Sequence, residues 1–468
     1  MFHLFGKGSF ALFFVFLLFF HFMSLSVLTV YSYGQTPQTL TLKEAFWTAL
    51  SKNPVINQAL ASRKRAESHV KQSISAFLPK VDLELGYSRS NNPVMVFGSK
   101  LNQAAFSNQD FAIDTLNNPD YRDDWQTRII LTQPLFNQGR EYIGFKTSEL
   151  MKDVSEYGVV RAGQEVLFTV ESAYCQALLA QEKVDVLKLA LETAKAHRKL
   201  SEKRYEAGLV LKSDVLSADV QKTATERQLF QAENDLKVAT ASLNKAMGIS
   251  QDIFWRLKPL DNENRDGGSL EAWLKKAREN RPEVLIAKDQ LRIAEYNHRQ
   301  AQFHFLPSFN LHGIYQQNRE NFADFGGDSW TLMATMSVNL FSGFGQMAQV
   351  SASNAEMDRA AARLREVENN IELEVRKAFY GFQTAQKQLR VTRQAVEQAK
   401  EGQRILKNRY ENGLALMVEL LAADTSVREM MLQEAKARFD ARLAWSELRW
   451  KTGILGKDMI NTASSSSN

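Results

Sequence analysis

Two long segments of the chain carry apolar residues in alternating steps of three and four positions. The first stripe comprises Val166, Val170, Ala173, Ala177, Ala180, Val184, Leu187, Leu191 and Ala194, and the second comprises Ile371, Val375, Ala378, Phe382, Ala385, Leu389, Thr392, Val396 and Ala399. This spacing places each stripe along one side of an α-helix, as in coiled coils. No proline interrupts residues 140–207, which predicts a helix on the order of 100 Å long at about 1.5 Å per residue. Such a helix suits a tube or a stalk rather than a compact domain.

Four other segments alternate apolar and polar residues with a period of two. They cover residues 81–87, 125–135, 309–315 and 330–340. Period-two segments of about ten residues, with aromatic residues near their ends, are typical of transmembrane β-strands. An ordinary soluble hairpin is the alternative interpretation of the alternation alone.

The N-terminal residues have the pattern of an export signal. Lys7 precedes a mostly apolar run from Phe10 to Val30, and the small residues Ser32 and Gly34 follow. We predict that residues 1–34 are a secretory signal peptide, cleaved after Gly34. The run is long for a signal, so an uncleaved membrane anchor is the alternative. No cysteine lies near the predicted cleavage point, which excludes a lipid anchor there.

The chain contains an internal repeat. At one constant separation, Leu-Phe recurs at 135–136 and 340–341, Arg-Tyr-Glu-x-Gly-Leu-x-Leu at 204–211 and 409–416, and Gly-Ile at 248–249 and 453–454. Upstream, Phe-Leu-Pro recurs at 77–79 and 305–307, at a separation larger by about 23 residues. One duplication with one long loop explains both separations. We place the extra residues in the polar, Asn-rich segment 91–124 and predict an extracellular loop there.

The repeat defines the domain organisation. Residues 35–248 form the first copy and residues 249–456 the second, and a polar, disordered tail is expected over residues 457–468. Each copy contains a helix (54–76 or 282–303), two strands, a very long helix, a glycine turn and a returning helix. The shorter helices, placed end to end, nearly match the long helix in length and are expected to line it.

Composition and charge narrow the functional classes. Among 468 residues, 23 glycines and 9 prolines are few, in agreement with long helices. The net charge is +5 and the basic residues are interspersed with acidic ones, which favours solvated helix faces over a nucleic-acid surface. Cys175 is the only cysteine, so it cannot form an intramolecular disulfide and is expected to be a small packed residue.

Four strands cannot close a barrel in lipid, where open sheet edges are excluded. A membrane barrel must therefore be shared between chains, with eight strands from two protomers or twelve from three. His312, in a predicted strand, is then expected to be a polar residue facing the lumen rather than a metal ligand. Phosphate-binding, Cys-x-x-Cys and His-Glu-x-x-His motifs are missing from the sequence. We therefore predict a protein that is not an enzyme and has no cofactor or metal site.

These residues together resemble the TolC-like outer-membrane efflux proteins, specifically the non-lipidated members. The resemblance rests on the ordered, duplicated set of helix, Phe-Leu-Pro, strand hairpin, Leu-Phe, long helix and Tyr-x-x-Gly-Leu turn, and it covers nearly the whole mature chain. It implies a mainly α-helical protein with a transmembrane β-barrel. Three protomers would share a barrel of twelve strands in the outer-membrane lipid, and their long antiparallel helices would form a periplasmic α-barrel.

The resemblance also implies a function. Such proteins are exit ducts of tripartite efflux pumps or type I secretion systems, and they receive cargo from an inner-membrane transporter through a periplasmic adaptor. The expected partners are thus two further copies of the chain, an adaptor and a transporter. The alternative is a coiled-coil structural protein that is anchored in the outer membrane and conducts nothing, although a stalk has no need of strands.

The glycine turns are the most specific site candidates. Gly208 and Gly413 each follow a long helix, where a left-handed glycine can end the helix. A plain hairpin cap is the bland interpretation. The resemblance implies that these turns form the periplasmic mouth and dock adaptor hairpins, and the exposed apolar candidates for that contact are Leu209, Leu211, Leu414 and Leu416.

A periplasmic gate is the second site that the resemblance implies. Carried over by position, the gate residues are Tyr410, Asp214 and Glu419. The chain departs from the family pattern at Ala422, where a further acid is expected, and at Ala415, where some relatives carry arginine. The familiar acidic ring is therefore incomplete. Ser213 is expected to cap the returning helix of the first copy.

At the opposite end, aromatic residues are expected where the strands meet the membrane surfaces. The candidates for this interfacial belt are Tyr87, Trp125, Tyr315 and Trp330. The sequence does not identify the cargo, because drugs, metals, solvents and polypeptides all pass through similar ducts.

Overall fold

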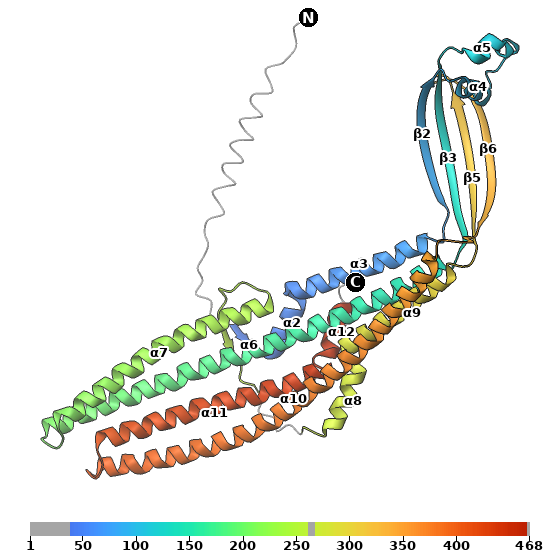
Figure 1. The fold of residues 1–468 in the computed structure, drawn as a ribbon. Coiled ribbons are helices and arrows are strands. Elements are labelled where there is room, and N and C mark those ends of the chain that lie inside the picture. Colours follow the sequence, from blue (N-terminus) through green and yellow to red (C-terminus); the bar gives the residue numbers. More distant parts are fainter. Residues whose placement is uncertain (1–37, 261–266, 466–468) are drawn as a thin grey trace, which may run out of the picture.

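The computed structural model describes residues 38–260 and 267–465, so the predicted signal peptide, residues 1–34, lies outside the described residues. The two copies lie side by side in an elongated molecule, with a four-stranded sheet at one end and helical hairpins at the other (Figure 1). Copy one contains α2 (Leu42–Lys52), α3 (Pro54–Ser75), α6 (Arg140–Glu206) and α7 (Lys212–Met247). Copy two contains α8 (Leu270–Asn280), α9 (Pro282–Phe303), α10 (Gly345–Glu411) and α11 (Met417–Lys451).

The two long helices, α6 and α10, are each 67 residues long, which corresponds to about 100 Å. In the first stripe, Ala173 and Ala180 are half-buried and the other residues are buried, as the spacing predicts. In the second stripe, Leu389, Thr392 and Ala399 are half-buried and the rest are buried. Each long helix packs against the shorter helices of its own copy, and α6 also packs against α9 and α11 of the second copy.

The shorter helices meet end to end beside each long helix. At the junction in copy one, the Asn53 amide Nδ2 donates to the carbonyl oxygen of Ala246 at 2.8 Å. At the matching junction in copy two, Arg281 Nη1 donates to the carbonyl oxygen of Trp450 at 3.4 Å. The predicted stacking is therefore confirmed, and these contacts hold the start of one short helix against the end of the other.

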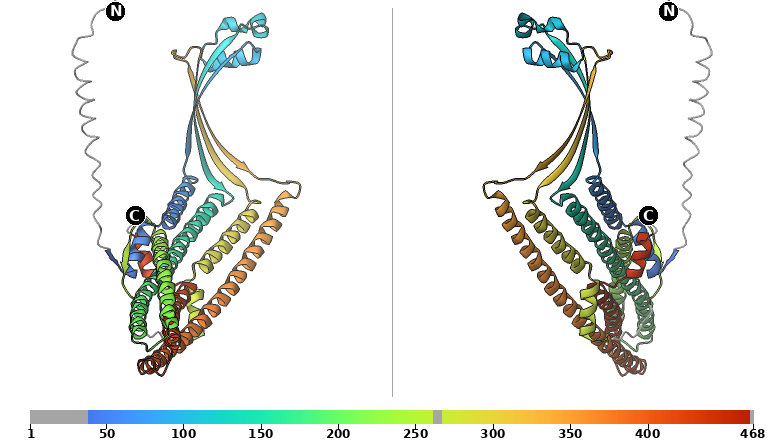
Figure 2. Two further views of the ribbon diagram at one scale, coloured as in Figure 1. Left: turned by 90° about the vertical axis from the view of Figure 1, so that its left-hand side faces the viewer. Right: turned by 90° about the vertical axis from the view of Figure 1, so that its right-hand side faces the viewer.

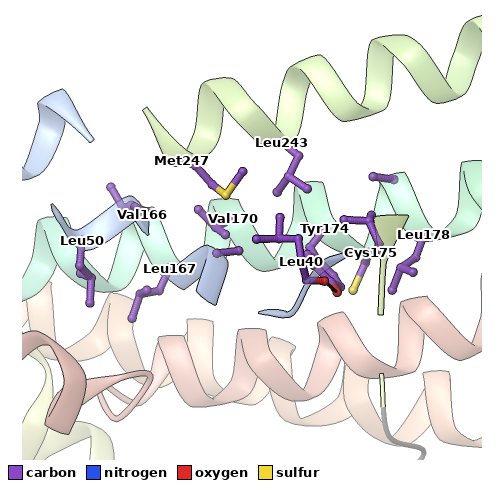
Figure 3. Packing of buried hydrophobic residues seen from close by; sticks show 14 of the residues in the cluster. Leu40, Leu50, Val166, Leu167, Val170, Tyr174, Cys175, Leu178, Leu243 and Met247 are labelled. Atoms are coloured by element: carbon purple, nitrogen blue, oxygen red, sulfur yellow. Dashed lines mark hydrogen bonds between the residues drawn. The ribbon is translucent and has the colours of Figure 1, made fainter. Parts of the chain in front are cut away.

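A two-stranded sheet beside the middle of α6 was not predicted. The strands β1 (Gln38–Leu40) and β4 (Trp255–Leu257) pair in parallel and lie beside α6 with α2. The buried residues beneath them include Val170, Leu243 and Met247 (Figure 3). Strands of three residues carry too little periodicity to be recognised in a sequence.

The phenol of Tyr174 closes this core. Its ring is fully buried, and its hydroxyl lies 2.8 Å from the carbonyl oxygens of Leu40 and Lys258, which share its single proton. Burial raises the pKa of Tyr174 to about 12. The hydroxyl therefore ties the β1–β4 pair to the long helix in its neutral form.

This pKa predicts a loss of stability in alkali. A tyrosine in an unfolded chain has a pKa of about 10, so above pH 10 the unfolded chain releases a proton that folded Tyr174 keeps. We expect the free energy of unfolding to fall by up to about 1.4 kcal/mol per pH unit between about pH 10 and 12. Urea denaturation of the native protein and of Tyr174→Phe across this range measures the effect. The Tyr174→Phe protein should be less stable at neutral pH, and its free energy of unfolding should change less between about pH 10 and 12. If the free energies of the two proteins fall in parallel with pH, the raised pKa of Tyr174 is contradicted.

The C-terminal residues correct one prediction. Residues 457–468 were expected to be disordered, but Lys457–Ser465 form helix α12. Ile460 is buried against α6 at Gly163, where an added Cβ would lie 2.9 Å from the Ile460 side chain. The apolar residues Met459 and Ile460 therefore anchor a segment whose average composition is polar, and the small Gly163 allows α12 to approach the long helix.

The sheet contains the four predicted strands, β2 (Lys80–Ser90), β3 (Arg122–Asn137), β5 (Ser308–Arg319) and β6 (Gly327–Ser337). They are antiparallel in the order β2-β3-β5-β6. In Figure 2 the strands continue into the helices at one end of the sheet. β2 and β6 are the edges and have one strand neighbour each in this sheet, so the described chain alone leaves both edges open.

The loop between β2 and β3 is longer than the loop between β5 and β6, as the two repeat separations predict. Residues 91–121 join the first pair of strands, and residues 320–326 join the second. The long loop is folded into α4 (Pro93–Asn102), a 3-10 turn (Asn108–Phe111) and α5 (Ile113–Asn117).

Candidate functional site

The two hairpin turns have the same geometry. Gly208 and Gly413 both have a φ of 75°, a left-handed conformation that glycine adopts without steric cost. In the first turn the N–H of Leu209 donates to the carbonyl of Arg204 at 2.8 Å, and in the second Leu414 donates to Arg409 at 2.8 Å. This bonding is the Schellman motif, which ends each long helix and reverses the chain.

The four candidate docking leucines lie at these turns and are exposed. Their exposed fractions are 73% for Leu209, 72% for Leu211, 68% for Leu414 and 63% for Leu416. Both turns lie at the same end of the molecule, away from the sheet (Figure 1). The structure therefore gathers two apolar tips at one end, where another protein could bind them.

Arg204 joins the two tips, a role that no sequence pattern indicated. Its guanidinium donates from Nη1 to the carbonyl oxygen of Tyr410 and from Nη2 to that of Glu411, both at 2.9 Å. It also lies over the Tyr410 ring, 4.8 Å from the centroid. The carbonyls in the last turn of a helix lack partners within that helix, so Arg204 binds the end of α10 from the end of α6.

The three predicted gate residues are not brought together. The ring of Tyr410 is buried within its own hairpin beside Met417 and Leu420, and the Glu419 carboxylate accepts from the Leu416 N–H at 2.8 Å, which caps α11. Asp214 lies in the first turn of α7. Among the described residues, no hydrogen bond or ion pair joins Tyr410, Asp214 and Glu419.

One detail of the returning helices differs from the prediction. The residue at the cap position of α7 is Leu211, not Ser213, because the helix begins at Lys212, two residues earlier than a Ser213 cap requires. Asp424 lies further along α11, away from the expected acidic ring. Its carboxylate lies 2.8 Å from His197 Nε2 of α6 and accepts from Gln403 Nε2 of α10 at 2.7 Å. This cluster borders a small cavity of about 90 Å³ and forms a second tie between the two hairpins.

The sheet has one apolar and one polar face. Leu83, Ile129, Tyr315 and Trp330 share a row on the apolar face, because they are successive register partners. On the opposite face, Arg128 Nη2 donates to Glu84 Oε2 at 2.7 Å. The alternation that predicted strands therefore also segregates the chemistry of the two faces, as in a wall between lipid and water.

Aromatic residues mark both ends of the apolar face. At the end farther from the helices, the rings of Tyr87 and Trp125 are 4.7 Å apart. At the end nearer the helices, Phe136 and Phe309 are 6.5 Å apart, and these two were missed. The rows are about 33 Å apart along the strands at about 3.3 Å per residue and bound an apolar band. Tyr315 and Trp330 lie inside the band.

The described residues contain neither a metal site nor a membrane-spanning helix. Over residues 38–260 and 267–465, no group of three or more His, Cys, Asp or Glu side chains is placed to hold a metal ion. In the same ranges no helix is both long enough and apolar enough to cross a membrane.

Comparison with known proteins decides the family. The sequence model described as "Outer membrane efflux protein" matches residues 47–249 and 273–453. The chain belongs to this family. The two matched blocks fall in the two copies of the repeat, so the assignment does not rest on a single motif.

Relatives of this efflux protein have similar lengths. The alkaline protease secretion protein AprF of Pseudomonas aeruginosa is 23% identical over 423 residues, which cover 89% of this chain and 85% of AprF. The outer membrane protein TolC of Salmonella enteritidis is 22% identical over 443 residues, with coverages of 92% and 85%. The outer membrane channel CmeC of Campylobacter jejuni has a similar fold, with a TM-score of 0.74, 17% identity and coverages of 90% and 89%.

These findings give the efflux protein a location and a general role. It is an outer-membrane protein with a long helical extension into the periplasm, and it is an exit channel for efflux or secretion. The family consists of channel proteins rather than enzymes. This assignment favours the channel over the non-conducting stalk.

Proposed function

We propose that three copies of the chain share one barrel of twelve strands and one tunnel of helices. The supporting observation is the sheet, which has an apolar face and two open edges, β2 and β6. Lipid offers no hydrogen bonds to open edges, so each edge must pair with the opposite edge of another copy. Head-to-tail pairing of this kind closes into a ring under cyclic symmetry.

The trimer predicts a specific contact between protomers. β2 of one copy pairs with β6 of the next, which can be tested by placing single cysteines on these two strands and oxidising the protein in outer membranes. Cross-linked products of up to three chains support the proposal. Products of two chains at most, or no cross-link at any pair of positions, contradict it.

Inside the membrane, the polar face of the sheet lines a water-filled lumen and the apolar face contacts lipid. Continuous with this lumen, the helices form a periplasmic tunnel. Cargo passes through it without being chemically changed. Energy then comes from an inner-membrane transporter, and a periplasmic adaptor connects that transporter to the duct. The resemblance to AprF favours a secreted polypeptide as cargo, and the resemblance to CmeC is one of fold.

The adaptor binds the hairpin tips in this proposal. The support is the exposure of Leu209, Leu211, Leu414 and Leu416 at a single end of the molecule. Apolar side chains that are exposed together commonly mark a protein contact. The tips also lie farthest from the sheet and so nearest to the inner membrane (Figure 1).

Charged substitutions at the tips should weaken adaptor capture. We expect Leu209→Asp with Leu414→Asp to weaken adaptor binding by about tenfold or more, because a desolvated leucine contact of about 1.4 kcal/mol is replaced by a charge. Co-purification after periplasmic cross-linking measures the loss. Leu209→Met with Leu414→Met is the matched control and should bind normally. Equal capture by both variants would place the docking surface elsewhere.

The second-copy hairpin acts as the gate, held closed against the first copy by Arg204 and by the cluster of His197, Gln403 and Asp424. Tyr410 and Glu419 support this gate from within the second hairpin, where they fix the end of α10 and the start of α11. Asp214, near the first tip, is still proposed as a gate residue.

A further inference from the structure

The long loop of the first copy is a folded unit. Asn92 Oδ1 accepts from the N–H groups of Val94 and Met95 and caps α4, and Lys100 Nζ lies 2.6 Å from Asp110 Oδ1. We call residues 91–121 the cap.

Aromatic packing and charge hold the cap together. The Phe106 ring packs edge-on against Phe97 at 4.8 Å and Phe111 at 5.2 Å. The bond from Lys100, with help from Ser107, lowers the pKa of Asp110 to about 2. The Asp110 carboxylate is therefore ionised at neutral pH.

The cap is fastened to the sheet by a buried polar group. Gln103 is only 6% exposed; its Nε2 donates to Asp124 Oδ1 at 3.0 Å and to the Asp123 carbonyl at 2.8 Å. Its Oε1 accepts from Arg122 Nε at 2.8 Å. Asn318 of β5, 2% exposed, donates from Nδ2 to the same Asp124 carboxylate at 2.9 Å. Buried amides with all these partners hold one orientation.

The end of α4 also reaches the far side of the sheet. A Cβ added at Gly327, the first residue of β6, would lie 2.3 Å from the carbonyl oxygen of Asn102. The helix therefore extends across the sheet from β3 to β6. Figure 2 shows the cap leaning to one side of the sheet rather than continuing the line of the strands.

The hydrogen bonds identify which face the cap covers. Tyr87 and Trp125 are register partners with rings in contact on the apolar face. Asp124 is the next residue and so points to the opposite face. Asn318 is the register partner of Gln126, two positions from Asp124, and shares that face. The cap thus covers the polar face, at the end of the sheet farthest from the helices.

We propose that the cap narrows the outer opening of the duct and holds back large solutes that approach from outside the cell. The inference rests on the proposed function, in which the polar face lines the lumen. Three caps, one from each protomer, then project over the opening from its rim. Since only the first copy carries the insertion, each protomer contributes one cap.

The test uses a cysteine below the cap. Thr331 lies on the polar face of β6, four residues inward from Gly327, and the native Cys175 is buried. We would label Thr331→Cys on intact cells with a small maleimide and with a maleimide attached to a large polymer. With the cap in place, the large reagent should react roughly tenfold more slowly than the small one, because the opening selects by size.

Two cap variants complete the test. Replacing residues 91–121 with the sequence of residues 320–326 should make both reagents react at similar rates, and Gln103→Ala with Lys100→Ala should give an intermediate rate in a chain that keeps its full length. Asp324→Cys, in the short β5–β6 loop, is the control for reagent access. Equal rates for both reagents beneath the intact cap would overturn the inference and leave the duct standing. If even the small reagent fails to label Thr331→Cys while it labels Asp324→Cys, the polar face does not line a water-filled lumen and the proposed duct is contradicted.

Discussion

Replacing Arg204 with alanine is expected to open the helical end of the duct. The change removes two charged hydrogen bonds to the end of α10 and the contact with the Tyr410 ring. Hydrogen bonds to charged groups contribute about 1.5–3 kcal/mol each when shielded, and Arg204 is half-buried. A net loss of about 1.4 kcal/mol would raise the ratio of open to closed channels about tenfold. Single-channel recording in planar bilayers measures this ratio.

The repeat supplies a matched control for this experiment. Arg409 occupies the same place in the second copy, but its Nη2 donates to Leu414 O in its own turn at 3.2 Å. Arg409→Ala should therefore leave the tie between the hairpins intact and change the open fraction little. If the two variants behave alike, the effect comes from the turn motif and not from the link between the copies.

Breaking the buried ion pair between α6 and α11 should have the largest effect on stability. Glu171 is 1% exposed, and Arg442 Nε lies 2.6 Å from its Oε1. Arg442→Ala would leave a buried carboxylate without its partner, which typically costs about 3–5 kcal/mol. Urea denaturation of the detergent-solubilised protein should show this loss as a lower midpoint.

Two comparisons separate this cost from general damage to a helix. Arg359→Ala removes an ion pair with Glu356 whose side chains are 77% and 49% exposed, and such surface pairs contribute at most about 1 kcal/mol. Replacing Glu171 and Arg442 together, by Glu171→Gln with Arg442→Met, should restore part of the stability lost in Arg442→Ala. If the Arg442→Ala protein is as stable as the native protein, water reaches the Glu171 carboxylate.

The sequence predicted the parts of the fold that have strong periodicity. The stripes at Val166–Ala194 and Ile371–Ala399 identified the long helices, and alternation identified the four strands of the sheet. The duplicated Gly208 and Gly413 turns were predicted because only a left-handed residue ends a helix in this way. The position of the cap insertion also followed from the two repeat separations.

Contacts between the copies could not be predicted, because they depend on how two similar units pack. Arg204 and Arg409 lie in the same motif, yet one crosses to the other hairpin and the other binds its own turn. Asp424 of α11 likewise pairs with His197 of α6, 227 residues earlier. The helix over residues 457–465 depends on Ile460, a single anchor in a polar segment.

Conduction through the proposed duct can be measured by inserting the purified native protein into planar bilayers and recording the conductance before and after the adaptor is added. We expect discrete channels of one size class, low in open fraction until the tips are engaged or Arg204 is replaced. Purified trimers that insert but give no channels, with Arg204→Ala equally silent, would contradict the proposed duct.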